Sequence, residues 1–182
     1  MKIFELYEQS PNSLIVGGHH GDEPIGVDIC KKLIELIPEN NGVHIIPIAN
    51  RPAFIGKTRE FDGVDLNRSY GNNVSGVTEL DEMSDTIKGL STGAKVVIDC
   101  HSTPIKDLDE ISVYPNLLGA ELAPLMGLPY YMQEPPETSL RGYCEAIGVP
   151  MITFEGVHEL HEESVAAGVA GIMKLLNGLN LL

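Results

Sequence analysis

The sequence is poor in basic residues. It has 12 lysines and arginines against 26 aspartates and glutamates, which gives a formal net charge of -14. Nucleic-acid backbones and anionic membrane surfaces both attract clusters of lysine and arginine, so we expect neither as a partner. We interpret the acidic stretches 79–85 and 107–110 as solvated surface loops.

The sequence also has few cysteines and no long apolar run. Cys30, Cys100 and Cys144 are odd in number, widely spaced and outside any CxxC motif, which argues against structural disulfides and a cysteine-based zinc knuckle. No apolar run reaches the length of about 18 residues that a membrane span needs. Glu5 and Glu8 fall where a signal peptide would need an apolar core, so the N-terminus predicts a first strand and a cytoplasmic location.

Repeats, low-complexity tracts and linkers are missing as well, and we therefore expect one domain over residues 1–182. Short apolar, β-branched runs alternate along the chain with helical patterns. Several of these runs are continuous, which is typical of strands covered on both faces. The predicted strands are 2–7, 13–17, 43–48, 95–100, 111–114 and 150–154.

Three helical patterns lie between and after these runs. The first extends to about Leu36, with Asp22 as its N-cap and Pro24 in its first turn. The second covers 139–147 and the third about 161–176. The alternation predicts an α/β domain with a mostly parallel, centrally buried sheet. Ligands of such folds gather at the carboxyl ends of the strands.

The segment LIVGGHHGDEPIG, residues 14–26, lies at one such strand end. His20 and Glu23 are three positions apart at the junction of strand and helix, where both side chains can turn back and share one cation. Imidazole nitrogen and carboxylate oxygen together suit zinc. The alternatives are a helix capped by Asp22 beside two incidental histidines, or a plain loop.

A third candidate ligand is His101, at the end of the predicted strand in KVVIDCHST. By itself it could be a hydrogen-bonded histidine at a strand end. Together with His20 and Glu23 it makes a three-ligand set that leaves one position for water, as catalytic zinc requires. Three of the other histidines fit less well, because they lie within a strand or in the acidic segment that leads into a helix. They are His44, His158 and His161.

The segment TREFDGVDLNRSY, residues 58–70, combines amide and guanidinium donors in an acidic protein. Arg68 offers a planar fork suited to a carboxylate, Asn67 adds an amide, and Arg59 lies shortly before. These residues favour an anionic ligand. The alternative is a surface turn with local salt bridges.

The apolar run in GVPMITFEGVHEL meets Glu155. A carboxylate inside a buried strand is usually paired or functional. Near a zinc-bound water it could accept a proton and pass it to a leaving amine. The alternative is that the strand ends at Phe154 and that Glu155 is exposed.

Four motifs in this order resemble zinc carboxypeptidase-like hydrolases, most closely the succinylglutamate desuccinylase and aspartoacylase branch. The resemblance implies a three-layer α/β/α sandwich around a mixed, mostly parallel central sheet. The motifs are HGDE at 20–23, DLNR at 65–68, DCHST at 99–103 and ITFEG at 152–156.

The resemblance also implies the roles of the site residues. His20, Glu23 and His101 hold one zinc ion per chain, Glu155 is the general base and then the acid, and Arg59 steadies the oxyanion. Asp65 orients a zinc histidine, expected to be His20. Asn67 and Arg68 bind a substrate carboxylate. Arg141 either adds a carboxylate contact or caps a short helix, and an assisting tyrosine is undecided among Tyr130, Tyr131 and Tyr143.

The implied activity is zinc-dependent hydrolysis of an amide bond next to a free carboxylate, most directly the deacylation of a small N-acyl amino acid. The alternatives are a metallocarboxypeptidase acting on a peptide and a catalytically silent metal-binding module. Members of the branch commonly carry a further C-terminal β-rich domain that helps to close the site. We therefore expect a more open pocket here, or one that a second subunit of a homo-oligomer completes.

Overall fold

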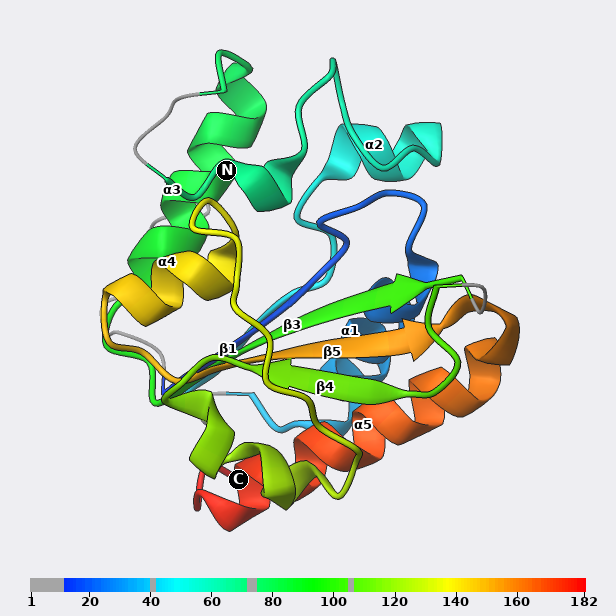
Figure 1. Cartoon of the computed structure of the whole chain (residues 1–182), viewed down its shortest axis with the longest axis vertical. Helices are drawn as coiled ribbons and strands as arrows, with labels where there is room; N and C mark the ends of the chain where they lie inside the picture. The colour runs from blue at the N-terminus through cyan, green and yellow to red at the C-terminus, as the bar shows by residue number, and fades with distance from the viewer. Residues whose placement is uncertain (1–11, 40–41, 72–74, 105–106) are drawn as a thin grey trace.

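A five-stranded sheet with the order β2-β1-β3-β5-β4 forms the centre of the protein (Figure 1). The computed structural model describes residues 12–39, 42–71, 75–104 and 107–182, and the strand predicted at 2–7 lies outside them. Four strands are parallel, and β4 pairs antiparallel with β5 at one edge. The strands are β1 (Ser13–Gly17), β2 (Val43–Ile46), β3 (Val96–Thr103), β4 (Ser112–Pro115) and β5 (Met151–Val157).

Helices cover both faces of this sheet, which confirms the three-layer α/β/α sandwich (Figure 1). Side chains alternate between the faces along each strand. Ile98 and Phe154 belong to the core under α1 and α5, whereas Val97 and Met151 belong to the core under α3 and α4. Burial on both faces explains the continuous apolar runs. The helices are α1 (Pro24–Leu36), α2 (Arg51–Gly56), α3 (Thr78–Ser91), α4 (Leu140–Ala146) and α5 (His161–Gly178).

The acidic stretch 79–85 lies in α3, so the loop predicted there is wrong. Leu80 and Ile87 are fully buried, but Ser84 and Ser91 occupy the other buried positions of the helix. Because half of the inward stripe consists of serine, the helical period of apolar residues is hard to detect. Helix α2 and the short 3-10 turns were not predicted either. These turns are η2 (Leu66–Arg68), η3 (Gly119–Glu121), η4 (Ala123–Met126) and η5 (His158–Leu160).

Two strands extend further than predicted. Strand β5 continues to Val157 and contains Glu155, so the alternative in which it ends at Phe154 is wrong. Strand β3 continues to Thr103, and His101 therefore lies within it. The two extensions pair with each other, with His101 opposite Glu155, so the ladder continues after the apolar residues end.

Helix α1 begins at Pro24 with Glu23 in the N-cap position, so the prediction of Asp22 as the cap is wrong. Asp22 is exposed, and the Glu23 side chain makes no capping hydrogen bond. Helix α4 agrees with its prediction, because Ser139 is the N-cap and its hydroxyl accepts from the Gly142 N–H. Within the described parts of the chain, no helix combines the length and the hydropathy that crossing a membrane requires.

Glycine at position 21 lets the loop after β1 pack directly on α2. A Cβ at Gly21 would lie 2.0 Å from the backbone carbonyl of Ala53, and the Gly21 N–H donates to the Thr58 carbonyl at 2.8 Å.

We expect Gly21→Ala to lower the free energy of unfolding by about 1–3 kcal/mol, because its Cβ would clash with the Ala53 carbonyl. Gly89→Ala is the matched control: a Cβ meets nothing within 4 Å there, inside α3. It should raise stability by about 0.5–1 kcal/mol in the same urea titration. Equal effects at the two positions would refute the packing argument.

Candidate active site

A cavity of about 370 Å³ lies at the carboxyl ends of the parallel strands. It brings together side chains that are far apart along the chain. All of the predicted site residues except Asp65 line it: His20, Glu23, Arg59, Asn67, Arg68, His101, Arg141 and Glu155. Further lining residues include Asp99, Thr103, Asp107, Tyr114 and Glu134.

Glu23 lies between two imidazoles in this cavity. His20 Nδ1 is 2.7 Å from Glu23 Oε1, and His101 Nδ1 is 2.9 Å from Glu23 Oε2. One donor atom from each of the three side chains lies within 4.8 Å of the others. The set of two imidazoles and one carboxylate matches a ligand set of catalytic zinc sites, so these residues fit a zinc ion.

The outer nitrogens of both histidines face carboxylates. His20 Nε2 is 3.1 Å from Asp65 Oδ1, and His101 Nε2 is 2.7 Å from Asp99 Oδ2. Metal-binding histidines generally donate their second N–H to such a partner, which fixes the ring and its tautomer. Both histidines therefore present Nδ1 toward Glu23 and are held from behind.

The backbone places these groups through a turn and two strands. Gly18 follows β1 with a φ of +65°, a left-handed conformation that glycine adopts without steric cost, and the chain turns there into His19 and His20. Glu23 follows at the start of α1, and its Oε2 accepts from the Ser102 backbone N–H at 3.0 Å. Together these contacts fix the carboxylate against β3.

Charge interactions in the cluster outweigh burial. Burial alone would raise the pKa of Glu23. His101 and His20 hold that pKa well below the ordinary value, through their positive charge and their hydrogen bonds to the carboxylate. Burial would lower the pKa of His101, yet Asp99 and Glu23 raise it well above its usual range. Burial likewise opposes ionisation of Asp65, but His20 and then nearby arginines lower its pKa to about 2. The cluster is thus built to hold positive charge between carboxylates.

Glu155 faces the same cavity from the neighbouring strand. It is paired with His101 across β3 and β5, so the two side chains leave the sheet on one face. Its Oε2 accepts from the Thr103 hydroxyl at 3.1 Å. Burial raises the pKa of this carboxyl group, as suits a group that accepts and returns a proton.

The arginines lie at different depths. Arg59 is half exposed and its two terminal nitrogens contact Glu23 Oε1 at 3.3 Å and Asp65 Oδ2 at 3.2 Å. Arg68 is exposed, and its Nη1 donates to the Asn67 carbonyl at 2.7 Å. Each guanidinium has five N–H donors, so both arginines keep donors for a further ligand beside these contacts.

Arg141 is buried in the wall of the cavity. Its Nη1 donates to the Tyr114 carbonyl at 3.1 Å, and its Nε has no hydrogen-bond partner among the described residues. Ser139 caps α4, so the alternative in which Arg141 is a helix cap is wrong. Among the described residues, Tyr114 is the tyrosine that lines the cavity, whereas Tyr130, Tyr131 and Tyr143 do not line it.

Asn67 connects the 65–68 turn to the rest of the site. Its Oδ1 accepts from the Leu140 backbone N–H at 3.0 Å, and its Nδ2 lies 3.2 Å from His101 Nε2. Three buried residues beside His101 have no role predicted from the sequence: Asp99, which lines the cavity, and His19 and Tyr70, which lie behind it. For Asp99 a signal was present, because a residue two positions before His101 on a strand shares its face.

Comparison with known proteins identifies the relatives. A family model described as the succinylglutamate desuccinylase/aspartoacylase catalytic domain matches residues 9–179. An N-alpha-acetyl-L-2,4-diaminobutyric acid deacetylase of Halomonas elongata is 33% identical over 104 residues, which are 49% of this chain and 30% of that protein. The match therefore covers less than a third of the length of that relative.

Solved structures share the fold. The ectoine utilization protein EutE (DoeB) of Ruegeria pomeroyi is 21% identical with a TM-score of 0.78, covering 93% of this chain and 57% of that one. An aspartoacylase family protein of Mesorhizobium loti is 24% identical with a TM-score of 0.77, covering 96% and 59%. Csd4 of Helicobacter pylori, a D,L-carboxypeptidase, is 18% identical with a TM-score of 0.77, covering 95% and 52%.

The chain spans between 52% and 59% of the length of these structures. The alignments cover 93% and 96% of this chain for the Ruegeria and Mesorhizobium proteins, so the similarity in fold is not confined to one part of it. With a family match over residues 9–179, the chain belongs to the succinylglutamate desuccinylase/aspartoacylase family.

Proposed function

We propose that the protein is a zinc-dependent hydrolase that cleaves an amide bond next to a free carboxylate, and that its substrates are small N-acyl amino acids. The observation that carries this proposal is that one cavity of about 370 Å³ unites three zinc-type donors, a half-buried carboxyl group and three arginines. Its volume lies in the range of small-molecule sites, about 300–1,000 Å³.

His20, Glu23 and His101 would hold the zinc ion, with Asp65 and Asp99 behind the two histidines. When bound there, zinc supplies Lewis-acid polarisation of the scissile carbonyl and of the attacking water. Glu23 Oε2 stays tied to the Ser102 N–H, so the carboxylate keeps its orientation toward both imidazoles.

Glu155 moves the protons in this mechanism. It lies beside His101 on the next strand and faces the cavity, where it accepts a proton from the attacking water. The same carboxyl group then donates that proton to the departing amine nitrogen. The Thr103 hydroxyl holds one carboxylate oxygen and leaves the other for this exchange.

The arginines account for the preference for a neighbouring carboxylate. Arg68 and Arg141 provide guanidinium groups at the cavity wall, in a protein whose net charge would otherwise repel an anion. Asn67 adds an amide N–H, and Arg59, which contacts Glu23, can meet the negative charge that develops on the carbonyl oxygen. The deacetylase activity named for the Halomonas elongata relative, on an N-acetylated amino acid, supports this substrate class.

The test is a substrate panel with the zinc-loaded protein. We expect hydrolysis of at least one among N-acetylaspartate, N-succinylglutamate and N-acetyl-2,4-diaminobutyrate. Hydrolysis should be much slower for the same compound when the carboxylate next to the scissile amide is converted to a carboxamide. Turnover of short peptides alone would replace this proposal with a carboxypeptidase. Equal turnover of acid and carboxamide would refute the role of the arginines.

The pH profile tests the environment of Glu155. Burial raises the pKa of Glu155 and the Thr103 hydroxyl opposes this by stabilising the charged form. The base is inactive when protonated, so kcat/KM should fall as the pH drops through this pKa. We expect Thr103→Val to shift that acid limb to higher pH, because it removes the opposing hydrogen bond. Thr86→Val, which alters an exposed hydroxyl on α3 bonded to the Glu82 carbonyl, should leave the limb in place. A shift to lower pH in Thr103→Val would contradict the assignment.

A further inference from the structure

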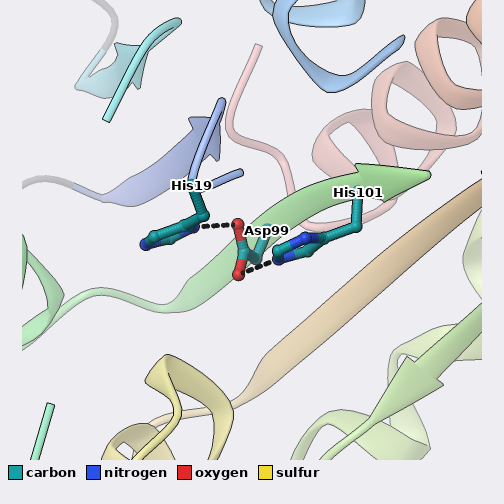
Figure 2. Close-up of side chains that lie close together, drawn as sticks. All are labelled: His19, Asp99 and His101. Carbon is teal, nitrogen blue, oxygen red and sulfur yellow. Dashed lines mark hydrogen bonds and ion pairs between the residues drawn. The ribbon is translucent and has the colours of Figure 1, made fainter. Parts of the chain in front are cut away.

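A chain of hydrogen bonds continues from the candidate zinc site into the protein, behind His101. Figure 2 shows Asp99 between the rings of His19 and His101, with one carboxylate oxygen toward each. His19 Nδ1 is 2.8 Å from Asp99 Oδ1, and His19 Nε2 is 2.5 Å from the Tyr70 hydroxyl. His19 and Tyr70 are each 1% exposed, and neither lines the cavity, so this part of the chain is sealed from solvent.

The donor and acceptor roles along this chain follow from Asp99. An ionised carboxylate only accepts, so His101 Nε2 and His19 Nδ1 must each carry a proton. His19 then has its lone pair on Nε2, where the Tyr70 hydroxyl donates. His101, which donates through Nε2, is left in the zinc-loaded protein with its lone pair on Nδ1, directed toward Glu23.

Asn67 does not compete for this proton. Its Oδ1 accepts from the Leu140 N–H, so the group near His101 Nε2 is the amide nitrogen, which is a donor. Two donors cannot form a hydrogen bond with each other, whereas Asp99 Oδ2 is an acceptor at 2.7 Å. Asp99 therefore decides the tautomer of His101.

His19, Asp99 and His101 also have donor atoms within 4.8 Å of one another, and a second cation is the alternative. The contacts disfavour it. Both nitrogens of His19 are already paired, at 2.8 Å with Asp99 and at 2.5 Å with Tyr70. Both carboxylate oxygens of Asp99 are paired as well, and His19 has no access to the cavity.

We propose that His19 is a positioning residue for the zinc site: supported by Tyr70, it holds Asp99 in the orientation that fixes the ring and the tautomer of His101. This inference rests on the proposed function, because it takes His101 as a zinc ligand. His19 acts two hydrogen bonds away from the metal, on the opposite side of Asp99. Without the Nδ1–H of His19, Oδ1 of the fully buried Asp99 carboxylate has no hydrogen-bond donor, and Asp99 is free to turn away from His101.

The test compares His19→Asn, His19→Gln and His19→Leu in the full chain. The amide nitrogen of asparagine is as many bonds from Cα as Nδ1 and can still donate to Asp99. The amide of glutamine corresponds to Nε2 and reaches toward Tyr70 instead, and leucine donates to neither. We expect the zinc dissociation constant, from competition with a chelator, to rise about 10–100-fold in the Gln and Leu variants and to stay within about threefold of wild type in the Asn variant.

Two further readouts separate positioning from a loss of folding. The visible absorption spectrum of the cobalt-loaded protein reports the ligand geometry, and it should change in His19→Gln but not in His19→Asn. Near-ultraviolet circular dichroism of the metal-free variants establishes that they are folded, and the glutamine variant carries the test if the leucine variant does not fold. Wild-type affinity and spectrum in His19→Gln would overturn the inference, as would equal losses in the Asn and Gln variants. Absence of zinc binding at His20, Glu23 and His101 in the wild type would overturn the proposed function first, and this inference with it.

Discussion

Glu155→Gln is expected to lower kcat by about 10²–10⁴-fold while zinc remains bound at one ion per chain. The amide keeps the size of the carboxyl group and can still meet the Thr103 hydroxyl, but it cannot accept a proton from water. Because Glu155 does not contribute a donor atom to the zinc set, metal content should not change. Steady-state hydrolysis and elemental analysis of the same preparation measure the two quantities.

Glu121→Gln is the control for this prediction. It makes the same chemical change at an exposed position in η3 that does not line the cavity, and it should keep wild-type kcat. Unchanged hydrolysis in Glu155→Gln would refute Glu155 as the base. If zinc binds but neither the wild type nor the variant hydrolyses any amide of the panel, the protein is a silent metal-binding module on this fold.

Glu23→Ala is expected to abolish stoichiometric zinc binding and, with it, hydrolysis. The substitution removes the carboxylate that both imidazoles face and leaves the Ser102 N–H without its acceptor. Removing one partner from a buried charge cluster costs about 3–5 kcal/mol, so the metal-free variant should also unfold at a lower urea concentration. Zinc titration by calorimetry and urea unfolding without metal test the two effects.

Asp22→Ala is the matched control one position earlier. Asp22 is exposed and makes no cap for α1, so the variant should bind zinc normally and lie within about 0.5 kcal/mol of wild-type stability. Stoichiometric zinc in Glu23→Ala would show that the metal is held elsewhere. A large loss of stability in Asp22→Ala would restore Asp22 as the helix cap.

The sequence was most informative where a metal-binding or acidic side chain follows or interrupts a continuous apolar run. Continuous β-branched runs predicted the strands of the sheet, because burial on both faces leaves no polar positions in them. His20, Glu23, His101 and Glu155 were recognised because they interrupt or follow such runs. It was least informative at α3, where serines replace apolar residues on the buried face, and at the first residue of α1.

The placement of the arginines needed the fold. Sequence alone left Arg141 between a carboxylate contact and a helix cap, and the structure places it in the cavity wall with Ser139 as the cap. Arg59 and Arg68 are close in sequence, but Arg59 contacts Glu23 whereas Arg68 turns to the Asn67 carbonyl. Side-chain direction in a turn depends on which neighbours the tertiary structure brings near, and no period in the sequence encodes it.

Local burial patterns in the sequence were enough to predict a mostly parallel sheet, and intrinsic ligand chemistry was enough to predict the residue types of the candidate zinc site. The contact of His19 with Asp99, 80 positions away, and the place of Tyr70 behind His19 became visible in the folded protein alone. Such pairings depend on how β1, β3 and the turn after Asp65 are packed against one another. The hydrogen-bond partners of a buried polar group are set by that packing, since burial requires a partner without specifying which residue provides it.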